Sequence, residues 1–176
     1  MPAELTPLIA ATAQWLTRAY PAGGGAMDSA LSQVQARQAV TVAAGLRYPT
    51  PMDAALVMVT GPGGAARLDW IIGADGAGAD DAGEYAWRTW VDEVVASWAA
   101  CLLSTPGLAA TAVAALAESG QMDGSPAVFR RLTSPDERDR RAAALLRHPD
   151  LLAPIAGLHH TQLLARLSLG PALSGS

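Results

Sequence analysis

The side chains that most often act as acid–base groups or metal ligands near neutral pH are few in this sequence. Its three histidines are His148, His159 and His160. Neighbouring residues on a helix point about 100° apart, so His159 and His160 do not converge on one metal ion. The H-E-x-x-H pattern of zinc proteases is missing, and no two histidines stand four residues apart. We therefore expect no metal and no other cofactor.

The candidate nucleophiles are equally weak. Cys101 is the only cysteine and lies in an apolar run, where a thiol is typically a packing group and not a reactive thiolate. A single cysteine also excludes an internal disulfide. No serine stands in the G-x-S-x-G pattern, because Arg166 replaces the first glycine before Ser168. The sequence thus presents no catalytic constellation.

Arginine supplies all 12 basic residues, and lysine is absent. Schiff-base enzymes, pyridoxal phosphate enzymes, Walker A NTPases and protein kinases are excluded, because each requires a lysine in its site. The sequence therefore favours a non-enzymatic protein over an enzyme. An enzyme whose site is assembled from distant Asp, Arg and His residues stays open as an alternative.

Two glycine-rich segments resemble ligand-binding loops only in part. Residues 61–66 fit a loose G-x-G-x-x-A pattern, but the residues that follow alternate like a strand and do not open the helix of a dinucleotide site. The acidic segment 73–83 has alanine at the third and fifth positions counted from Asp75, where an EF-hand needs oxygen ligands. We expect a hairpin turn at 61–64 and a solvated loop at 73–83.

A segment at 149–169 loosely resembles a helix-turn-helix motif. The small residue, the turn glycine and the apolar positions by which such helices pack are matched by Ala153, Gly157, Leu158 and Leu163. The resemblance implies a DNA-binding regulator. The side chains that would contact bases or phosphates are His159, His160, Gln162 and Arg166. Two short packed helices without a DNA role are the alternative, which the net charge of −4 favours.

The strongest helical pattern, over 82–104, carries three tryptophans on one wide apolar face. Trp98 lies in the middle of that face and is expected in the core. Trp90 lies at its edge, bordered by polar residues, as an interface anchor would be. Trp87 and Trp90 are therefore candidate partner-binding residues, with burial of all three indoles as the alternative.

A second candidate surface is the arginine-rich helix expected at 135–147. Its arginines are interleaved with acidic residues, which is typical of a solvated, salt-bridged face. Docking to an acidic partner or to phosphate is the alternative, through Arg138 and Arg141.

The elements that would position these side chains are mainly helices. A Ser or Thr directly before Pro supplies an N-cap followed by a residue suited to the first helical position. Such pairs occur at Thr6-Pro7, Thr105-Pro106, Ser125-Pro126 and Ser134-Pro135. The expected helices are 7–20, 28–45, 82–104, 107–119, 126–132, 135–147, 149–156 and 159–169.

The segment 54–73 is the exception to the helical pattern. Two apolar runs flank the glycines at 61–64, and Leu68, Trp70 and Ile72 alternate with polar residues as on a strand with one buried face. The sequence thus predicts a mostly α (α+β) fold: a multi-helix single domain over 1–176 with one small antiparallel β-hairpin at about 54–73. Glycine-rich loops are expected at 21–26 and 73–83.

Length and composition set the class of protein. A chain of 176 residues suits one domain with one core. No run approaches the 18 or so apolar residues of a membrane span, and the first residues lack a basic signal-peptide region. We expect a soluble, cytoplasmic protein with no membrane contact. Its expected function is a non-enzymatic interaction module, an accessory subunit or adaptor, whose partner is another protein; nucleic acid is the less favoured partner.

Overall fold

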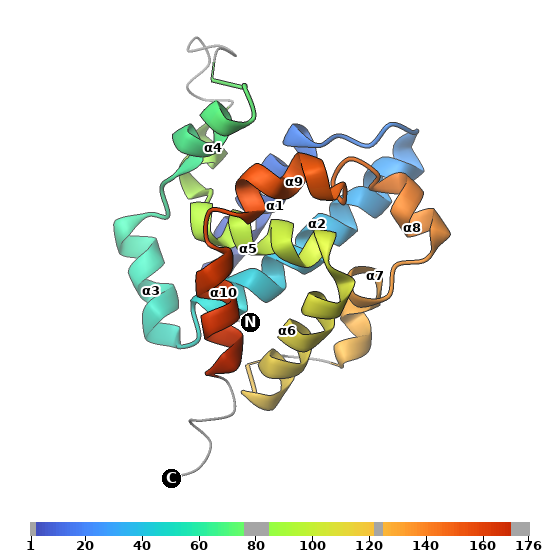
Figure 1. Ribbon diagram of the computed structural model, residues 1–176. Coiled ribbons are helices and arrows are strands. Elements are labelled where there is room, and N and C mark those ends of the chain that lie inside the picture. Colours follow the sequence, from blue (N-terminus) through green and yellow to red (C-terminus); the bar gives the residue numbers. More distant parts are fainter. Residues whose placement is uncertain (1–2, 76–84, 122–124, 170–176) are drawn as a thin grey trace.

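The computed structural model describes residues 3–75, 85–121 and 125–169 (Figure 1). The described residues form helices joined by turns and loops. The α-helices are α1 (Thr6–Ala19), α2 (Ala26–Arg47), α3 (Pro51–Thr60), α4 (Ala65–Ile71), α5 (Glu93–Ser104), α6 (Pro106–Glu118), α7 (Arg130–Thr133), α8 (Glu137–Ala142), α9 (Pro149–Ala156) and α10 (His160–Ser168). Short 3-10 helices lie at η1 (Ala3–Leu5), η2 (Ala86–Trp90) and η3 (Pro126–Phe129).

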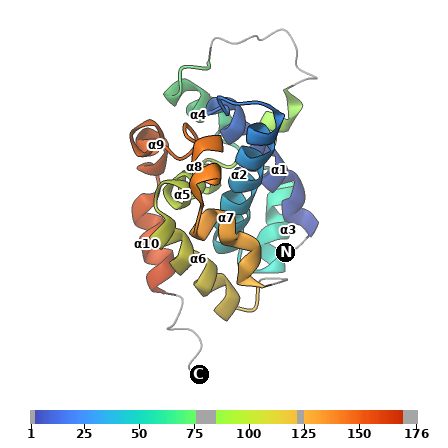
Figure 2. The same ribbon diagram turned by 90° about the vertical axis from the view of Figure 1, so that its right-hand side faces the viewer.

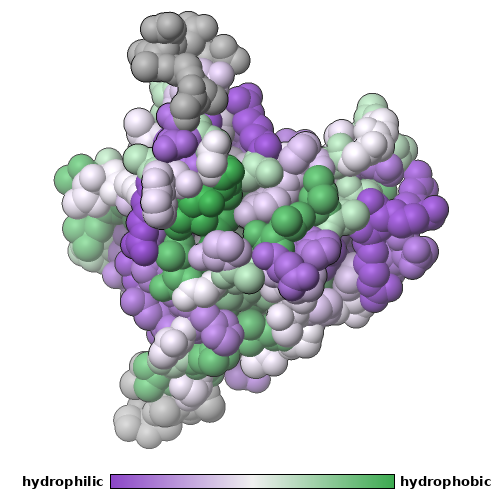
Figure 3. Space-filling model, turned by 45° about the horizontal axis from the view of Figure 1, so that its top comes forward, coloured by the Kyte–Doolittle hydropathy of each residue, from purple (hydrophilic) through white to green (hydrophobic). Residues whose placement is uncertain are grey.

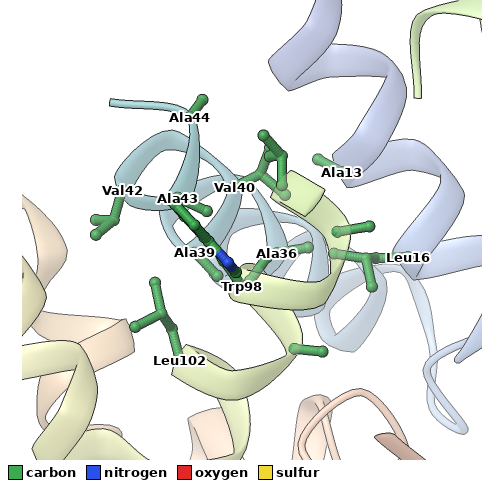
Figure 4. Close-up of a cluster of buried hydrophobic side chains, with 14 of the residues drawn as sticks. Ala13, Leu16, Ala36, Ala39, Val40, Val42, Ala43, Ala44, Trp98 and Leu102 are labelled. Carbon is green, nitrogen blue, oxygen red and sulfur yellow. The ribbon is translucent and has the colours of Figure 1, made fainter. Parts of the chain in front are cut away.

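The long helix α2 and the helix α5 form the centre of the molecule, and α1, α6 and α9 pack around them (Figures 1 and 2). The two central helices meet through small side chains. Figure 4 shows Trp98 and Leu102 of α5 beside the alanines of α2, with Ala13 and Leu16 of α1 on the other side. Fully buried alanines on the two helices are Ala36, Ala39, Ala43, Ala44, Ala96, Ala99 and Ala100. Small residues at these positions let the two backbones approach closely.

Most of the expected helices are confirmed, with shifted ends. Helical segments begin at or next to each of the four Ser/Thr-Pro pairs named above. Among those four pairs Ser125 is the one whose side chain is a cap, accepting a hydrogen bond from the Ala127 amide. The helix expected at 135–147 is shorter than predicted. It starts after Asp136, which forms a capping box with Asp139 in place of the predicted Ser134 cap, and it ends at Ala142.

The predicted β-hairpin at 54–73 is wrong. The segment forms two helices, α3 and α4, and no strand occurs among the residues that the structure describes. Thr50 explains the difference: with Pro51 at the first position it forms a capping box with Asp53 and starts α3. The glycines at 61–64 end α3 and lead into α4, and a single isolated bridge pairs Gly64 with Asp92.

The orientation predicted for Trp70 fails with the hairpin. On α4 the buried residues are Leu68 and Asp69, and the Trp70 side chain is 70% exposed. A helix turns neighbouring side chains by about 100°, so the alternation expected of a strand does not hold there.

The long helix expected at 82–104 is also interrupted. Residues 86–90 form η2, the chain is extended at Val91, and α5 starts only after Asp92. Asp92 accepts hydrogen bonds from the Val94 and Val95 amides and is the N-cap of α5. The expected start of this helix, at residues 82–84, lies outside the described residues. Trp98 is in the core, as predicted, with 3% of its surface exposed.

A half-buried guanidinium links the ends of α5 and α7 to the middle of α2. Arg147 donates hydrogen bonds to the Gln35 side chain on α2 and to the backbone carbonyls of Leu103 on α5 and Arg131 on α7. Gln35 in turn donates to the carbonyl of Asp139 on α8. The last carbonyls of a helix have no partner within it, so Arg147 satisfies groups that would otherwise be left open.

Candidate functional site

The most exposed apolar surface in the described chain belongs to α3. Met52, Leu56 and Val59 are 70%, 53% and 84% exposed. At about 100° per residue these three side chains fall within about 60° of one another, while the buried Ala54 and Val57 lie on the opposite side of the helix. We call Met52, Leu56 and Val59 the α3 stripe. Figure 3 shows hydrophobic side chains at the left edge of the molecule, over α3.

A cavity of about 630 Å³ lies between α3 and the start of α5. The side of α3 that carries Asp53 and Leu56 forms one wall, and the glycine-rich turn at 61–64 forms the rim. Arg47 and Tyr48 from the end of α2, with Asp92 and Glu93, line the remainder. Leu56 therefore belongs both to the α3 stripe and to this cavity.

Tyr48 and Asp92 are joined by a hydrogen bond, in which the phenol donates to carboxylate oxygen Oδ2. Asp92 is 4% exposed, and its other oxygen Oδ1 accepts the two amides of α5. Burial, followed by the hydrogen bond and the negative charge of Asp92, raises the pKa of Tyr48 well above its ordinary value of 10.0. The phenol therefore stays protonated and continues to donate its hydrogen bond to Asp92.

Glu93 is the second carboxylate at this end of α5. Its Oε1 atom lies 2.9 Å from Nε2 of His159 and 3.1 Å from Nη1 of Arg67. The Glu93 and His159 side chains are 13% and 18% exposed, whereas Arg67 is 60% exposed. The contact with His159 holds the start of α10 against α5. The His159 amide also donates a hydrogen bond to Oγ of Ser97 on α5.

The glycine turn is shaped by Glu93. Gly64 has a φ of +99°, and a Cβ atom there would lie 2.7 Å from the Cβ of Glu93. Only glycine fits this conformation and this close approach. The glycines of the G-x-G-x-x-A pattern thus bring the α3–α4 connection against the start of α5.

The tryptophans predicted to bind a partner are half-buried on η2. Trp87 and Trp90 pack against the core, and the guanidinium of Arg18 lies 4.9 Å from the centre of the Trp87 ring. Nearby, Arg88 forms an ion pair of 3.2 Å with Asp69, which accepts the indole N–H of Trp15. The break at Val91 rotates η2 out of the α5 face, so Trp87 and Trp90 do not share a stripe with Trp98.

Arg138 and Arg141, the arginines of the second candidate surface, are exposed on α8. Arg141 lies 4.0 Å from Glu137, and both side chains are more than 70% exposed. Figure 3 shows hydrophilic side chains over α8 at the right edge, opposite α3. Such an exposed pair contributes little to stability, which leaves both arginines available to solvent.

The helix-turn-helix-like segment forms α9 and α10, joined by a turn at 157–159. Two of its four candidate DNA contacts are engaged within the protein: His159 with Glu93, and Arg166, whose Nε donates to the Leu46 carbonyl. His160 and Gln162 are exposed. The four side chains therefore do not form one outward surface.

Sequence reasoning missed the α3 stripe and the cavity beside it. The Thr50-Pro51 pair is the signal that could have found α3, because it matches the pairs used elsewhere in the chain. The Tyr48–Asp92 and Glu93–His159 contacts span 44 and 66 residues, and no local spacing marks them. In comparisons with protein families, curated proteins and solved structures, nothing matches this chain.

Proposed function

We propose that the protein is a non-enzymatic interaction module that binds an apolar segment of another protein along α3. The observation that carries this proposal is the outward position of Met52, Leu56 and Val59, each more than half exposed. A surface helix normally turns its apolar stripe toward the core, and α3 buries only Ala54 and Val57. Contiguous exposed apolar side chains typically mark an interaction surface.

A protein partner suits this surface better than a lipid membrane does. Helices that lie on membranes carry Lys or Arg on their polar face to meet anionic lipids. Residues 51–60 contain no basic residue, and Asp53 is their only charged side chain. No described helix is long and apolar enough to cross a bilayer.

Nucleic acid is the less supported partner. The α3 stripe offers no positive charge to phosphate, and His159 and Arg166 of the helix-turn-helix-like segment are held by internal contacts. The DNA-binding hypothesis predicts affinity for duplex DNA that falls steeply as salt is raised. A titration at low ionic strength that finds no binding removes it.

The test of the proposed function is comparative capture. Immobilised protein and its L56D/V59D variant are incubated with an extract of the source cells, and bound proteins are quantified by mass spectrometry. The control is L145D, which places one aspartate on a side chain that is 41% exposed in the turn after α8, away from α3. We expect a partner retained by the wild type and L145D and lost by L56D/V59D.

Two other outcomes count against the proposal. If the α3 variant loses only self-association in light scattering, the stripe is a contact between copies of this chain. If it loses only binding to vesicles of phosphatidylcholine and phosphatidylglycerol, the stripe is a membrane contact. Thermal unfolding of each variant verifies that it is folded before capture.

A further inference from the structure

We infer that the partner segment that docks on the α3 stripe carries a lysine or arginine whose cationic end enters the cavity between α3 and α5. This inference rests on the proposed function and adds the chemistry of the partner. Its basis is that an acidic cavity opens directly beside an exposed apolar stripe, with Leu56 lining both.

The α3 stripe and the cavity lie on adjacent sides of α3. Taking Met52 as the origin on α3, Leu56 lies about 40° round the helix, and Asp53 lies about 100° round on the same side. Asp53 and Leu56 both line the cavity. A chain lying along the α3 stripe therefore passes the cavity mouth, within reach of a long side chain.

The charges of the cavity select a cation. Three of its lining residues, Asp53, Asp92 and Glu93, are acidic, and Arg47 is the cationic one. With Arg67, which lies outside the lining and pairs with Glu93, two cations stand against three acids, so an acidic excess remains. Within the described residues, the hydrogen bonds of Asp53 use Oδ2 and those of Glu93 use Oε1, so Oδ1 of Asp53 and Oε2 of Glu93 are left to meet a cation. Both oxygens of Asp92 are already engaged, by Tyr48 and by the amides of α5. An acidic recess beside an apolar stripe complements a basic residue beside an apolar one.

The cavity also has the size and mixed character of a side-chain pocket. Its volume of about 630 Å³ lies within the range of about 300–1,000 Å³ typical of binding clefts. Val57 and Val94 contribute apolar wall to the same cavity. Lysine and arginine fit such a site because their methylene stems pack on apolar surface while the charged end meets the carboxylates.

The experiment is a selection from a phage library of random 12-residue peptides on the wild-type protein. We expect binding peptides that lose at least tenfold in affinity against L56D and that contain Lys or Arg beside apolar residues more often than the library does. Peptides that depend on Leu56 without this excess overturn the inference and leave the proposed function standing. A selection with no Leu56-dependent peptide overturns both.

Charge pairing is then measured directly with one selected peptide and its lysine-to-norleucine form, against the wild type, D53N and E93Q. Norleucine keeps the stem and removes the charge. We expect the amide variants to weaken the lysine peptide about tenfold and to leave the norleucine peptide unchanged, as coupled neighbours do in a double-mutant cycle. Equal effects on both peptides overturn the inference. Both substitutions preserve side-chain shape, and thermal unfolding verifies their folding.

Chemical cross-linking gives a second test of the inference. A carbodiimide joins carboxylates to primary amines, and this sequence contains no lysine to compete with the peptide. We expect the lysine peptide to cross-link to Asp53 or Glu93. Cross-links confined to distant carboxylates such as Glu137, whose side chain is 79% exposed, overturn the inference.

Discussion

Replacement of Arg147 by methionine tests the account of how the helices are held together. Methionine keeps the length and the apolar stem of the side chain but removes its charge and its donors. Three acceptors lose their partner: Oε1 of Gln35 and the carbonyls of Leu103 and Arg131. The last two belong to the ends of α5 and α7, where no further helical amide can replace the guanidinium.

The expected loss follows from these contacts. Hydrogen bonds to a charged group contribute about 1.5–3 kcal/mol each, so three of them set an upper bound near 9 kcal/mol. The substitution also removes the cost of burying the guanidinium, a cost seen in the lowering of the pKa of Arg147 to about 10 by desolvation. We therefore expect R147M to lose about 3–5 kcal/mol, because three neutral acceptors are left without a donor at about 1–3 kcal/mol each and part of this is offset by the recovered desolvation.

The assay is urea unfolding followed by circular dichroism at a helical band. The matched control is R141M, which removes an exposed arginine from an ion pair of 4.0 Å and should cost less than about 0.5 kcal/mol. In a thermal melt, R147M should lower Tm by about 6–20 °C, since 1 kcal/mol shifts a chain of this size by about 2–4 °C. If R147M and R141M unfold within 1 kcal/mol of each other, Arg147 does not hold these helix ends.

Three further predictions address other parts of the fold. Trp70→Ala should change the free energy of unfolding by less than about 1 kcal/mol, because the Trp70 side chain is 70% exposed. Trp98→Ala should cost about 3–5 kcal/mol, because Trp98 is only 3% exposed. Equal losses would contradict the placement of α4. Gly64→Ala should cost about 1–3 kcal/mol in urea unfolding, because the new Cβ meets Glu93 at a positive φ, and a neutral result would refute this backbone. Burial raises the pKa of the Cys101 thiol from 9.0 to about 11, so Ellman's reagent at pH 8 should label it only when the protein unfolds. The stability that the protonated thiol contributes below pH 9 should be lost as the pH rises toward 11. Rapid labelling of the native protein would instead show an accessible thiol.

The helices were predictable where a start signal preceded a long apolar period. The runs after Thr6-Pro7 and Thr105-Pro106 gave helices within a residue or two of α1 and α6. The segment after Thr50-Pro51 was mistaken for a strand because its short apolar run, ended by glycines, fits either a buried strand or a helix by periodicity alone. The capping box between Thr50 and Asp53 decides the outcome locally.

The candidate site was less predictable because it depends on contacts between distant segments. Because one continuous helix was expected over 82–104, the sequence did not show that Asp92 caps α5 and accepts a hydrogen bond from the Tyr48 phenol. A continuous apolar pattern does not reveal such a break, since the residues on both sides of it are apolar. The exposure of the α3 stripe likewise follows from which side of α3 meets η1, and this is fixed by tertiary packing.

The alanine-lined contact between α2 and α5 has a consequence for how this protein can vary through evolution. An alanine codon changes by one base to Val, Gly, Pro, Thr, Ser, Asp or Glu. At fully buried positions such as Ala39 and Ala99, each of these adds volume, adds an unpaired polar group, or weakens or breaks the helix. Compensation would need a second change on the facing helix at the same time. Related chains should therefore keep alanine at these positions while the exposed residues of α8 vary, and the contact between α2 and α5 is where a distant relative would be easiest to detect.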